Sequence, residues 1–503
     1  MSEHLDQAKK HFQLGLEALG KGNFSQAEKD LRQANQLAPN RASILTNLSA
    51  ILIHQENWLE AIKFCNQVLK VEPNNPDGLN NLGVCRLHIN DDQDALVCFD
   101  QAVERDPSFV AAWVNKGNIF LDQGLFAQAR DCFDKALQLN ANSEEALNGL
   151  GNLHNELKKY SEAIECFSKA LEINPENFQA RWNKALSLLR LGEFKEGWEL
   201  FEARWNIPGM RQHKREFNVP LWLGKESIQN KTILIYSEQG YGDTIQFCRY
   251  IPLLESMGAK VIFIAPTSLV SLMTTLSKTV TVIADDILMP KKLDLDIDFY
   301  CPIMSLAFAF ETTLNSIPNQ TPYLYPSKIK CNYWDQKIKD SKSRVTPFRI
   351  GIAWAGSGHY AGKKSLKRDL PISVLAEIAN RLSDQKIEFH SLQVEERKNS
   401  LLASDVQSSF YFHHQDLRDF SDSASLMMSL DLIISIDTAA AHLAGALNLL
   451  TLLLIPDPPD FMAQIDRIDT PWYPNTKIIR QTSRGVWPID QITSEIKRII
   501  ESK

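Results

Sequence analysis

The feature that constrains this chain most is a repeat with a period of 34 residues, which runs from about residue 8 to residue 211. One position of the repeat holds a small residue, and a position 16 residues later holds a large one. The small residues are Gly15, Ser49, Gly83, Gly117, Gly151 and Ala185, and the large ones are Leu31, Cys65, Phe99, Phe133, Phe167 and Phe201. A unit of this length, copied six times, predicts helix pairs that bury their apolar faces against one another.

Each copy also ends in a characteristic way, with proline at residues 39, 73, 107 and 175 and alanine once, at residue 141. The pattern resembles the tetratricopeptide repeat. In that repeat small residues let the paired helices cross closely, an aromatic ring fills the gap, and proline ends the second helix. We therefore expect an all-helical solenoid of six repeats over residues 8–211, with a concave groove lined by the first helix of each pair.

A row of amides marks the positions expected to face that groove. Its members are Asn47, Asn81, Asn115 and Asn183, with Gln13 at the first repeat and Gly149 interrupting the row. Asparagine offers both a donor and an acceptor, so a row of them can hold an extended peptide by its backbone. A similar ladder lines the groove of the peptide O-linked N-acetylglucosamine transferases. The alternative is a set of solvated polar residues on an exposed helix face.

From Lys231 onward, short apolar runs alternate with amphipathic helical stretches, a pattern typical of parallel sheets covered by helices. Residues 212–230 lose the repeat pattern and form a cap and junction. The expected fold class is therefore an all-α solenoid followed by an α/β region of two Rossmann-like lobes. These lobes are residues 231–325 and 348–503, joined by a polar connector over residues 326–347.

The first candidate loop follows the first strand of this α/β region. Gly240 and Gly242 allow close approach of the backbone to a ligand, so we expect them to contact the donor, and Asp243 opens the next helix. A carboxylate in such a loop can face a cleft and accept a proton. Alternatively, Asp243 is simply the N-cap of its helix.

The second candidate loop follows a buried strand that ends at Asp437. Thr438 begins a helix that carries His442 four residues later on the same face. Amides at a helix N-terminus attract phosphate, the threonine hydroxyl adds a donor, and Asp437 can hold a sugar hydroxyl. Alternatively, Asp437 is a cap and His442 is a packed core histidine.

Cations for phosphate are available in residues 355–369, which contain Lys363, Lys364, Lys367 and Arg368. Of these we predict Lys364 as a donor-binding residue, although such a run is also typical of a solvated loop. Gln393 ends another strand. Its side chain either binds the base or a phosphate of the donor, or forms hydrogen bonds within the protein that serve the fold alone.

The segments that carry these candidates, together with their neighbours, follow one another along the chain in this order: SEQGYGDTIQFCRYIP, GIAWAGSGHY, KRDLPISVL, FHSLQ, DTAAAHLAGAL, DTPWYP and RQ. The set resembles bacterial transferases that append a GT-B glycosyltransferase to tetratricopeptide repeats, with a catalytic part similar to the lipopolysaccharide heptosyltransferases. The resemblance implies inverting, metal-independent transfer from a nucleotide-diphosphate sugar, with no further cofactor. It also implies that Asp243 is the general base, that Asp437 and Thr438 contact donor sugar and diphosphate, and that His442 supports their loop.

Three segments depart from that family. Ser357 follows the WAG triplet where asparagine is usual, Arg368 is followed by Asp369 rather than serine, and residues 460–463 replace a tryptophan-rich DWRW segment. The leading hypothesis is transfer of a sugar to a protein side chain presented by the groove. Two alternatives remain: glycosylation of a lipid or polysaccharide precursor, and a non-catalytic interaction scaffold.

Composition limits the other possibilities. The net charge is −7, and no basic cluster of the kind that nucleic-acid binders carry is present, so we expect no nucleic-acid partner. The first residues are polar, which predicts no secretory signal and a cytoplasmic protein. The longest apolar stretch, residues 442–456, is shorter than the roughly 20 residues that span a bilayer, so no transmembrane segment is expected. The eight cysteines contain no CxxC motif and are expected to be reduced packing residues.

Overall fold

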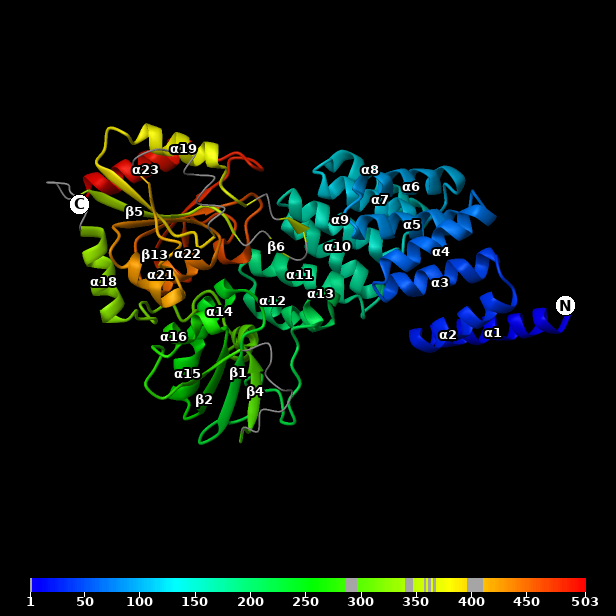
Figure 1. Ribbon diagram of the computed structural model, residues 1–503, viewed down its shortest axis with the longest axis horizontal. Helices are drawn as coiled ribbons and strands as arrows, with labels where there is room; N and C mark the ends of the chain where they lie inside the picture. The colour runs from blue at the N-terminus through cyan, green and yellow to red at the C-terminus, as the bar shows by residue number, and fades with distance from the viewer. Residues whose placement is uncertain are drawn as a thin grey trace. The chain divides into compact units, whose positions relative to one another are not determined.

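The computed structural model describes residues 2–285, 296–339, 347–356, 359–360, 363–364, 368–395 and 410–503 (Figure 1). The chain divides into two compact units, residues 1–180 and residues 181–503. All eight cysteines are free thiols, and seven of them are buried. Within the described ranges, every helix is too short or too polar to cross a lipid bilayer.

The first unit is a stack of helix pairs (Figure 1). Its helices are α1 Ser2–Gly20, α2 Phe24–Leu37, α3 Ala42–His54, α4 Trp58–Val71, α5 Pro76–His88, α6 Asp92–Arg105, α7 Val110–Asp122, α8 Phe126–Leu139, α9 Glu144–Glu156 and α10 Tyr160–Ile173. The helices α2, α4, α6 and α10 each end two residues before the proline of their repeat. Proline therefore stands just beyond the helix end, where its missing N–H costs nothing.

The two helices of a pair touch at the small residue of the repeat. A Cβ atom built on Gly83 would lie 2.6 Å from a ring carbon of Phe99, and one on Gly151 would lie 2.4 Å from Phe167. Such distances leave no room for a methyl group, so the aromatic ring fills the space that glycine opens. The close helix crossing predicted from the repeat is confirmed.

The second unit begins inside α11 Phe178–Leu191 and continues with α12 Phe194–Phe201. Leu189, Phe194 and Trp198 lie in one apolar core with the strand residues Ile233 and Phe263. The repeat pattern thus extends past the border of the first unit, because the last helix pair shares its core with the sheets.

A four-stranded parallel sheet forms the first part of the α/β region, in the order β3-β2-β1-β4. Its strands are β1 Thr232–Tyr236, β2 Lys260–Ala265, β3 Thr281–Ala284 and β4 Phe299–Pro302. Around it lie η1 Glu202–Asn206, α13 Pro208–Arg211, α14 Tyr241–Phe247, η2 Cys248–Tyr250, α15 Ile251–Ser256, α16 Thr267–Met273, η3 Ile303–Ser305 and α17 Leu306–Ala309. Ile233 and Ile235 share a core with α14–α16, whereas Leu234 and Tyr236 on the other face pack against Phe217.

A seven-stranded sheet forms the second part, in the order β12-β13-β11-β10-β5-β8-β9, with only the edge strand β12 antiparallel to its neighbour. Its strands are β5 Phe348–Ala353, β8 Ile387–Ser391, β9 Phe410–Phe412, β10 Leu432–Ile436, β11 Thr451–Ile455, β12 Asp469–Thr470 and β13 Tyr473–Arg480. The accompanying elements are α18 Lys328–Lys339, α19 Ile372–Arg381, α21 Phe420–Met427, α22 Ala439–Ala446, η4 Phe461–Ala463 and α23 Ile489–Glu501. Helices α19 and α23 cover one face, and α21 and α22 pack on the other (Figure 1).

Both sheets have a point at which the strand order reverses. In the first sheet it lies between β1 and β4, and in the second between β5 and β10. Ligands of open α/β sheets bind outside the carboxyl ends of the strands at such a point. The segments after β1 and β10 are therefore the positions at which a ligand is expected, and they carry the two loops predicted from the sequence.

Candidate functional site

The loop after β1 holds its carboxylate close to the backbone. Gly240 is the N-cap of α14, and Asp243 occupies the third helical position, where its Oδ2 accepts the N–H of Gly240 at 3.1 Å. Asp243 thus takes part in capping by reaching back to the N-cap from inside the helix, which differs from the N-cap role that the sequence left open.

The loop after β10 is arranged differently. Thr438 is the N-cap of α22, but its side chain caps no backbone N–H and instead lies 3.2 Å from the hydroxyl of Ser435. Asp437 precedes the cap, and its Oδ1 lies 3.8 Å from Nε2 of the buried His442. The cap position belongs to Thr438, so the alternative of Asp437 as the cap does not apply.

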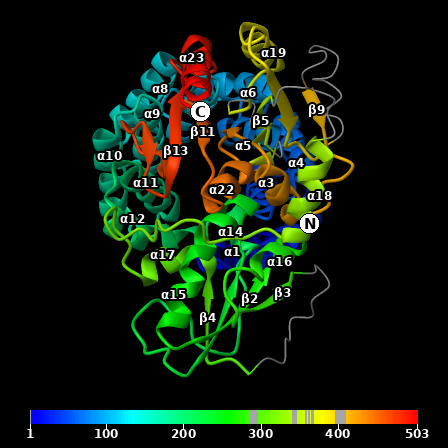
Figure 2. The same ribbon diagram turned by 90° about the vertical axis from the view of Figure 1, so that its left-hand side faces the viewer.

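The two loops meet where α14 and α22 pack together (Figure 2). A Cβ atom on Gly242 would lie 2.9 Å from Cδ2 of His442 and 3.6 Å from Cα of Ala439. Gly242 therefore has a packing role, because a side chain there would push the helices apart. Its predicted contact with a donor, like that of Gly240, stays a prediction.

Burial and mutual repulsion raise the pKa values of the carboxylates at this site. The pKa of Asp243 is raised to about 7 by burial and by the negative charges of Asp460 and Asp437, against the opposing bond from Gly240. The pKa of Asp437 is also raised to about 7, by burial and by Asp460, while Arg368 opposes the rise. Both groups therefore change charge near neutral pH, which is the range in which a general base is effective.

His442 is held as a neutral imidazole. Burial, together with the positive charges of Arg249 and Arg368, lowers its pKa to about 3. Its Nδ1 lies 3.0 Å from the hydroxyl of Tyr473. A neutral imidazole has one donor and one acceptor nitrogen, so its hydrogen bonds define which nitrogen carries the proton.

The remaining predicted donor ligands have different surroundings. Gln393 is buried and donates from Nε2 to the carbonyl of Ala355 at 3.0 Å, which ties the end of β8 to the end of β5. Asp369 accepts the N–H of Gly356 at 3.0 Å, so this departure from the family has a local structural role. Arg368 lies against Gly356, where a Cβ atom would be 2.7 Å from its guanidinium.

The lysine-rich segment is described only in part. Lys363 and Lys364 form β7, which pairs with β6 His359–Tyr360, but their side chains lie outside the description. Ser357 and Lys367 lie outside the described residues altogether. The predicted contact of Lys364 with phosphate stays a prediction.

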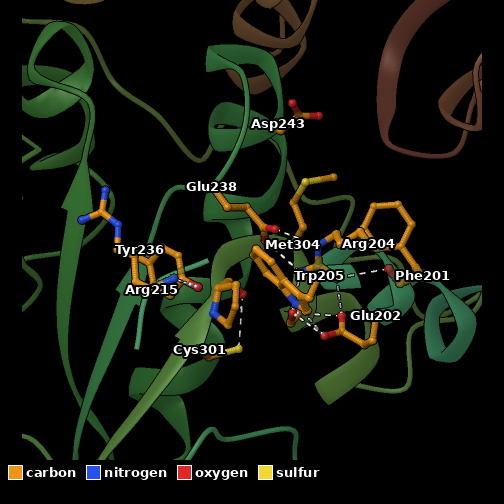
Figure 3. A network of polar contacts seen from close by, with 12 residues as sticks. Phe201, Glu202, Arg204, Trp205, Arg215, Tyr236, Glu238, Asp243, Cys301 and Met304 are labelled. Carbon is orange, nitrogen blue, oxygen red and sulfur yellow. Dashed lines mark hydrogen bonds and ion pairs between the residues drawn. The ribbon is translucent and has the colours of Figure 1, made fainter. Parts of the chain in front are cut away.

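A buried ion pair supports the first loop from below (Figure 3). Arg204 is fully buried and donates to both carboxylate oxygens of Glu238, at 2.7 and 3.0 Å. Glu238 also accepts the N–H of Met304 at 2.9 Å, and the ring of Trp205 stacks on the guanidinium at 4.3 Å. Burial raises the pKa of Glu238, which the Arg204 charge opposes. Glu238 lies two residues after the end of β1, so this pair fixes the base of the loop that carries Asp243.

A cavity of about 570 Å³ opens beside the first loop. Its lining residues are Tyr241, Pro266, Thr267, Ser268, Asp285, Arg418 and Asp419. Tyr241, Pro266 and Asp285 follow β1, β2 and β3, so the cavity lies at the carboxyl ends of the first sheet.

The asparagine row of the repeats is partly engaged within the protein. Asn47 donates to the carbonyl of Ser43 in its own helix, Asn81 to the hydroxyl of Ser49, and Asn115 to the side-chain oxygen of Asn80. Asn183 lies in α11 and is buried. At residue 149 the row contains glycine because a Cβ atom there would lie 2.4 Å from Phe133.

A second cavity, of about 530 Å³, lies in the first unit along α7 and α9. The residues that line it are Val110, Ala111, Val114, Asn115, Asn118, Asn140, Ser143, Glu145, Asn148, Asn177 and Gln179. Of the predicted row only Asn115 lines this cavity. The other amides at the cavity come from repeat positions that the row did not include.

Sequence reasoning missed several residues of the second unit. Asp460 was noted only as part of a departing segment, yet its charge acts on both carboxylates. Tyr473 and Arg249 fell inside the quoted motifs DTPWYP and QFCRYIP without an assigned role. Glu238 fell inside the quoted motif SEQGYGDTIQFCRYIP without an assigned role, and Arg204 fell in no motif. Their pairing joins positions 34 residues apart in different elements, so neither residue signalled it. In the described part of the chain, no group of three or more His, Cys, Asp or Glu side chains is arranged to hold a metal ion.

Comparison with known proteins supports the repeats. Residues 18–83 match one family model of the tetratricopeptide repeat, and residues 110–143 and 144–177 match another. The first part of the chain is thus a tetratricopeptide-repeat region, as its sequence predicted, and such regions are protein-interaction modules.

Individual proteins similar to this chain are distant and match only part of it. Protein FlbA of Caulobacter vibrioides is 24% identical over 330 residues, which cover 60% of this chain and 52% of that protein, so the chain spans about half of this relative. Among solved structures, the tetratricopeptide-repeat protein TTC0263 of Thermus thermophilus is 19% identical with a TM-score of 0.34, covering 36% of this chain and 99% of that one. PilF of Pseudomonas aeruginosa is 22% identical with a TM-score of 0.33, covering 41% and 92%.

Proposed function

We propose that the second unit is a GT-B glycosyltransferase domain that moves a sugar from a nucleotide-diphosphate sugar to a protein side chain bound by the repeats. The observation that carries the proposal is the contact between the two loops, where Gly242 of α14 meets His442 of α22. Each loop follows a strand at the reversal point of its own sheet. Two ligand-binding edges brought together in this way suit a reaction between two substrates.

The proposed chemistry uses the two sides of this contact. Asp243 takes the proton of the acceptor hydroxyl while the hydroxyl oxygen forms a bond to the anomeric carbon of the sugar. The bond from that carbon to the diphosphate oxygen breaks, and its electron pair leaves with the nucleoside diphosphate. Thr438, the N-terminus of α22 and Arg368 stabilise the departing negative charge. Attack opposite the leaving group inverts the configuration at the sugar.

The acceptor is proposed to bind in the repeats. The cavity along α7 and α9 is rich in side-chain amides, and such groups can bind the backbone of an extended peptide with little regard to its side chains. Asn115, Asn118 and Asn148 are the amides we assign to this contact.

The test begins with the donor, which is the substrate class best defined by the site. Thermal unfolding is measured with UDP-, GDP-, ADP- and dTDP-sugars, and with CMP-sugars as the monophosphate comparison, for wild type and Asp437→Ala. We expect one diphosphate sugar to raise the unfolding temperature of wild type and to leave that of Asp437→Ala unchanged. The identified donor is then used to measure transfer, which Asp243→Ala should abolish. Lack of any stabilisation in a folded preparation would overturn the proposal.

A second candidate is a non-catalytic interaction scaffold. It is favoured by residues 460–463, where the family has its tryptophan-rich segment. In this chain Phe461 packs edge-on against Trp198 of α12 at 5.6 Å and is buried. Transfer activity that depends on Asp243 would reject this candidate, whereas partner binding that survives Asp243→Ala with no detectable transfer would favour it.

A further inference from the structure

A buried arginine connects the two sheets beside the site. Arg249 lies in η2, directly after α14, and is 3% exposed. Its guanidinium donates to the carbonyls of Gln246 at 2.7 Å, Pro318 at 3.1 Å and Trp472 at 2.8 Å, and to the hydroxyl of Tyr323 at 2.9 Å. Acceptors on several segments therefore fix this cation in one position and orientation.

Arg249 in turn holds Tyr473, the first residue of β13. The rings of Tyr323 and Tyr473 both lie with their centroids 4.7 Å from the guanidinium carbon, a distance at which cation and ring attract each other. On its other side the ring of Tyr473 packs against α22 at Gly445, where a Cβ atom would lie only 2.3 Å away. Tyr473 is thus clamped between the cation and the helix, and its hydroxyl lies 3.0 Å from Nδ1 of His442.

The clamp decides the direction of the hydrogen bond between Tyr473 and His442. Burial raises the pKa of Tyr473 to about 12, so the phenol keeps its proton. The nearby positive charge of Arg249 favours the phenol as a donor and opposes a protonated imidazole. His442 Nδ1 therefore accepts from the hydroxyl, and the proton of the neutral ring resides on Nε2.

The opposite edge of the imidazole supports the same assignment independently. Nε2 of His442 lies 3.8 Å from Oδ1 of Asp437. Above about pH 7, where Asp437 is ionised, an N–H on the nitrogen facing it is attracted, whereas a nitrogen lone pair in that position is repelled. Both edges of the ring therefore favour the tautomer with its proton on Nε2.

We propose that Arg249 and Tyr473 are positioning residues, which fix His442 as a neutral imidazole whose Nε2–H is presented beside Asp437 for the diphosphate of the donor. The assignment of the diphosphate rests on the proposed function, whereas the assignment of the tautomer does not. A neutral donor in this position binds a phosphoryl oxygen without changing its own charge near neutral pH.

Histidine nitrogen chemical shifts test the tautomer directly in the full chain labelled with ¹⁵N-histidine. The signals of His442 are those that disappear in His442→Gln. We expect wild type to show a non-protonated Nδ1 and a protonated Nε2, and Tyr473→Phe to show a mixture of both tautomers. Tyr250→Phe is the matched control, since its buried hydroxyl bonds Thr312 at 2.8 Å and does not touch His442. A protonated Nδ1 in wild type would overturn the proposal, and this reading requires no variant of Tyr473 to fold.

Nucleotide binding tests the second part, with UDP, GDP, ADP and dTDP as the probes in isothermal titration. We expect Tyr473→Phe to weaken binding of the preferred diphosphate about tenfold, and Tyr250→Phe to change it less than twofold. Unchanged affinity in Tyr473→Phe would show that His442 does not bind the diphosphate. If none of the four nucleotides binds wild type while the tautomer is as expected, the positioning role stands and the proposed function fails.

Discussion

The loops after β1 and β10 both border the reversal point of their sheets but are stabilised in opposite ways. In the first loop, Asp243 bonds the N–H of Gly240, and the buried pair of Arg204 and Glu238 holds the strand end. In the second loop, Thr438 occupies the N-cap position, but its side chain forms no hydrogen bond with a backbone N–H of α22. The first loop thus uses its polar side chains to hold its own backbone, whereas the second leaves the amides at the start of α22 without that side-chain cap.

This difference indicates how the two loops divide their roles. A carboxylate already bonded to its backbone is held in one orientation, which suits a base that must meet a hydroxyl in a defined geometry. A helix N-terminus without a side-chain cap offers its N–H groups to an anion. The first loop is accordingly the rigid side of the proposed site, and the second is the side that a phosphate completes.

The largest effect is expected from the support of the first loop. Arg204→Met removes one partner of a fully buried pair and leaves the Glu238 carboxylate without its cation, which should cost about 3–5 kcal/mol of unfolding free energy. Urea unfolding of the full chain measures the loss. The double variant with Glu238→Gln also removes the buried carboxylate charge and should recover a large part of it, although Glu202, which pairs with Arg204 at 2.6 Å and is partly exposed, keeps its charge. A loss below about 1 kcal/mol in the single variant would show that the loop does not depend on this pair.

That pair also marks the limit of prediction from sequence. The repeat region was predictable because its information is local: each glycine and its aromatic partner recur at a fixed spacing, as Gly83 and Phe99 illustrate. The strand, glycine loop and helix around Asp243 were predictable for the same reason. Arg204 belongs to no quoted motif and Glu238 lies in one only as an unassigned residue, and neither the role of Asp460 nor that of Tyr473 follows from local pattern. Such contacts depend on how distant segments pack, which no spacing along the chain encodes.

The next largest effect is expected in the pH dependence of the free energy of unfolding, to which the carboxylates of Asp243 and Asp437 contribute. The unfolded chain releases an aspartate proton near pH 4, but in the folded protein Asp243 and Asp437 release theirs near pH 7. The folded state therefore loses stability as pH rises from about 4 to about 7. Asp243→Asn and Asp437→Asn should each raise the free energy of unfolding at pH 8 by roughly 2–4 kcal/mol, with no gain at pH 4.

Thermal unfolding at both pH values measures these gains. The variant Asp460→Asn tests the cause of these gains, because the charge of Asp460 raises the pKa of both carboxylates. We expect the gain from either substitution to shrink in the Asp460→Asn background. A gain that is equal at pH 4 and pH 8 would mean that titration of the carboxylate is not its cause.

A smaller effect separates the two glycines of the first loop. Gly242→Ala places a methyl group 2.9 Å from Cδ2 of His442 and should cost about 1–3 kcal/mol by forcing α14 and α22 apart. Gly240→Ala is the matched control, since its φ of −69° suits alanine and its nearest neighbour is the Asp243 carboxylate at 3.2 Å. Its cost should stay below about 1 kcal/mol. Equal losses in chemical unfolding would indicate that the two loops do not meet at Gly242.

The smallest effect concerns the cap of the second loop. Because the Thr438 side chain bonds no backbone N–H of α22, Thr438→Ala should cost about 0.5 kcal/mol or less. Ser143 is the matched control: it is the N-cap of α9 and accepts the N–H of Ala146, so Ser143→Ala should cost about 1 kcal/mol in the same unfolding assay.

The value of this pair of variants lies in a second measurement. If the Thr438 hydroxyl binds the diphosphate of a donor, Thr438→Ala weakens the stabilisation by that donor although it leaves the free protein almost unchanged. Ser143→Ala has the opposite effect: it lowers the stability of the free protein, but the donor stabilises the second unit as it does in wild type. A Thr438→Ala protein that is destabilised like Ser143→Ala and responds fully to the donor would show that the two loops are stabilised alike, and that Thr438 serves the fold.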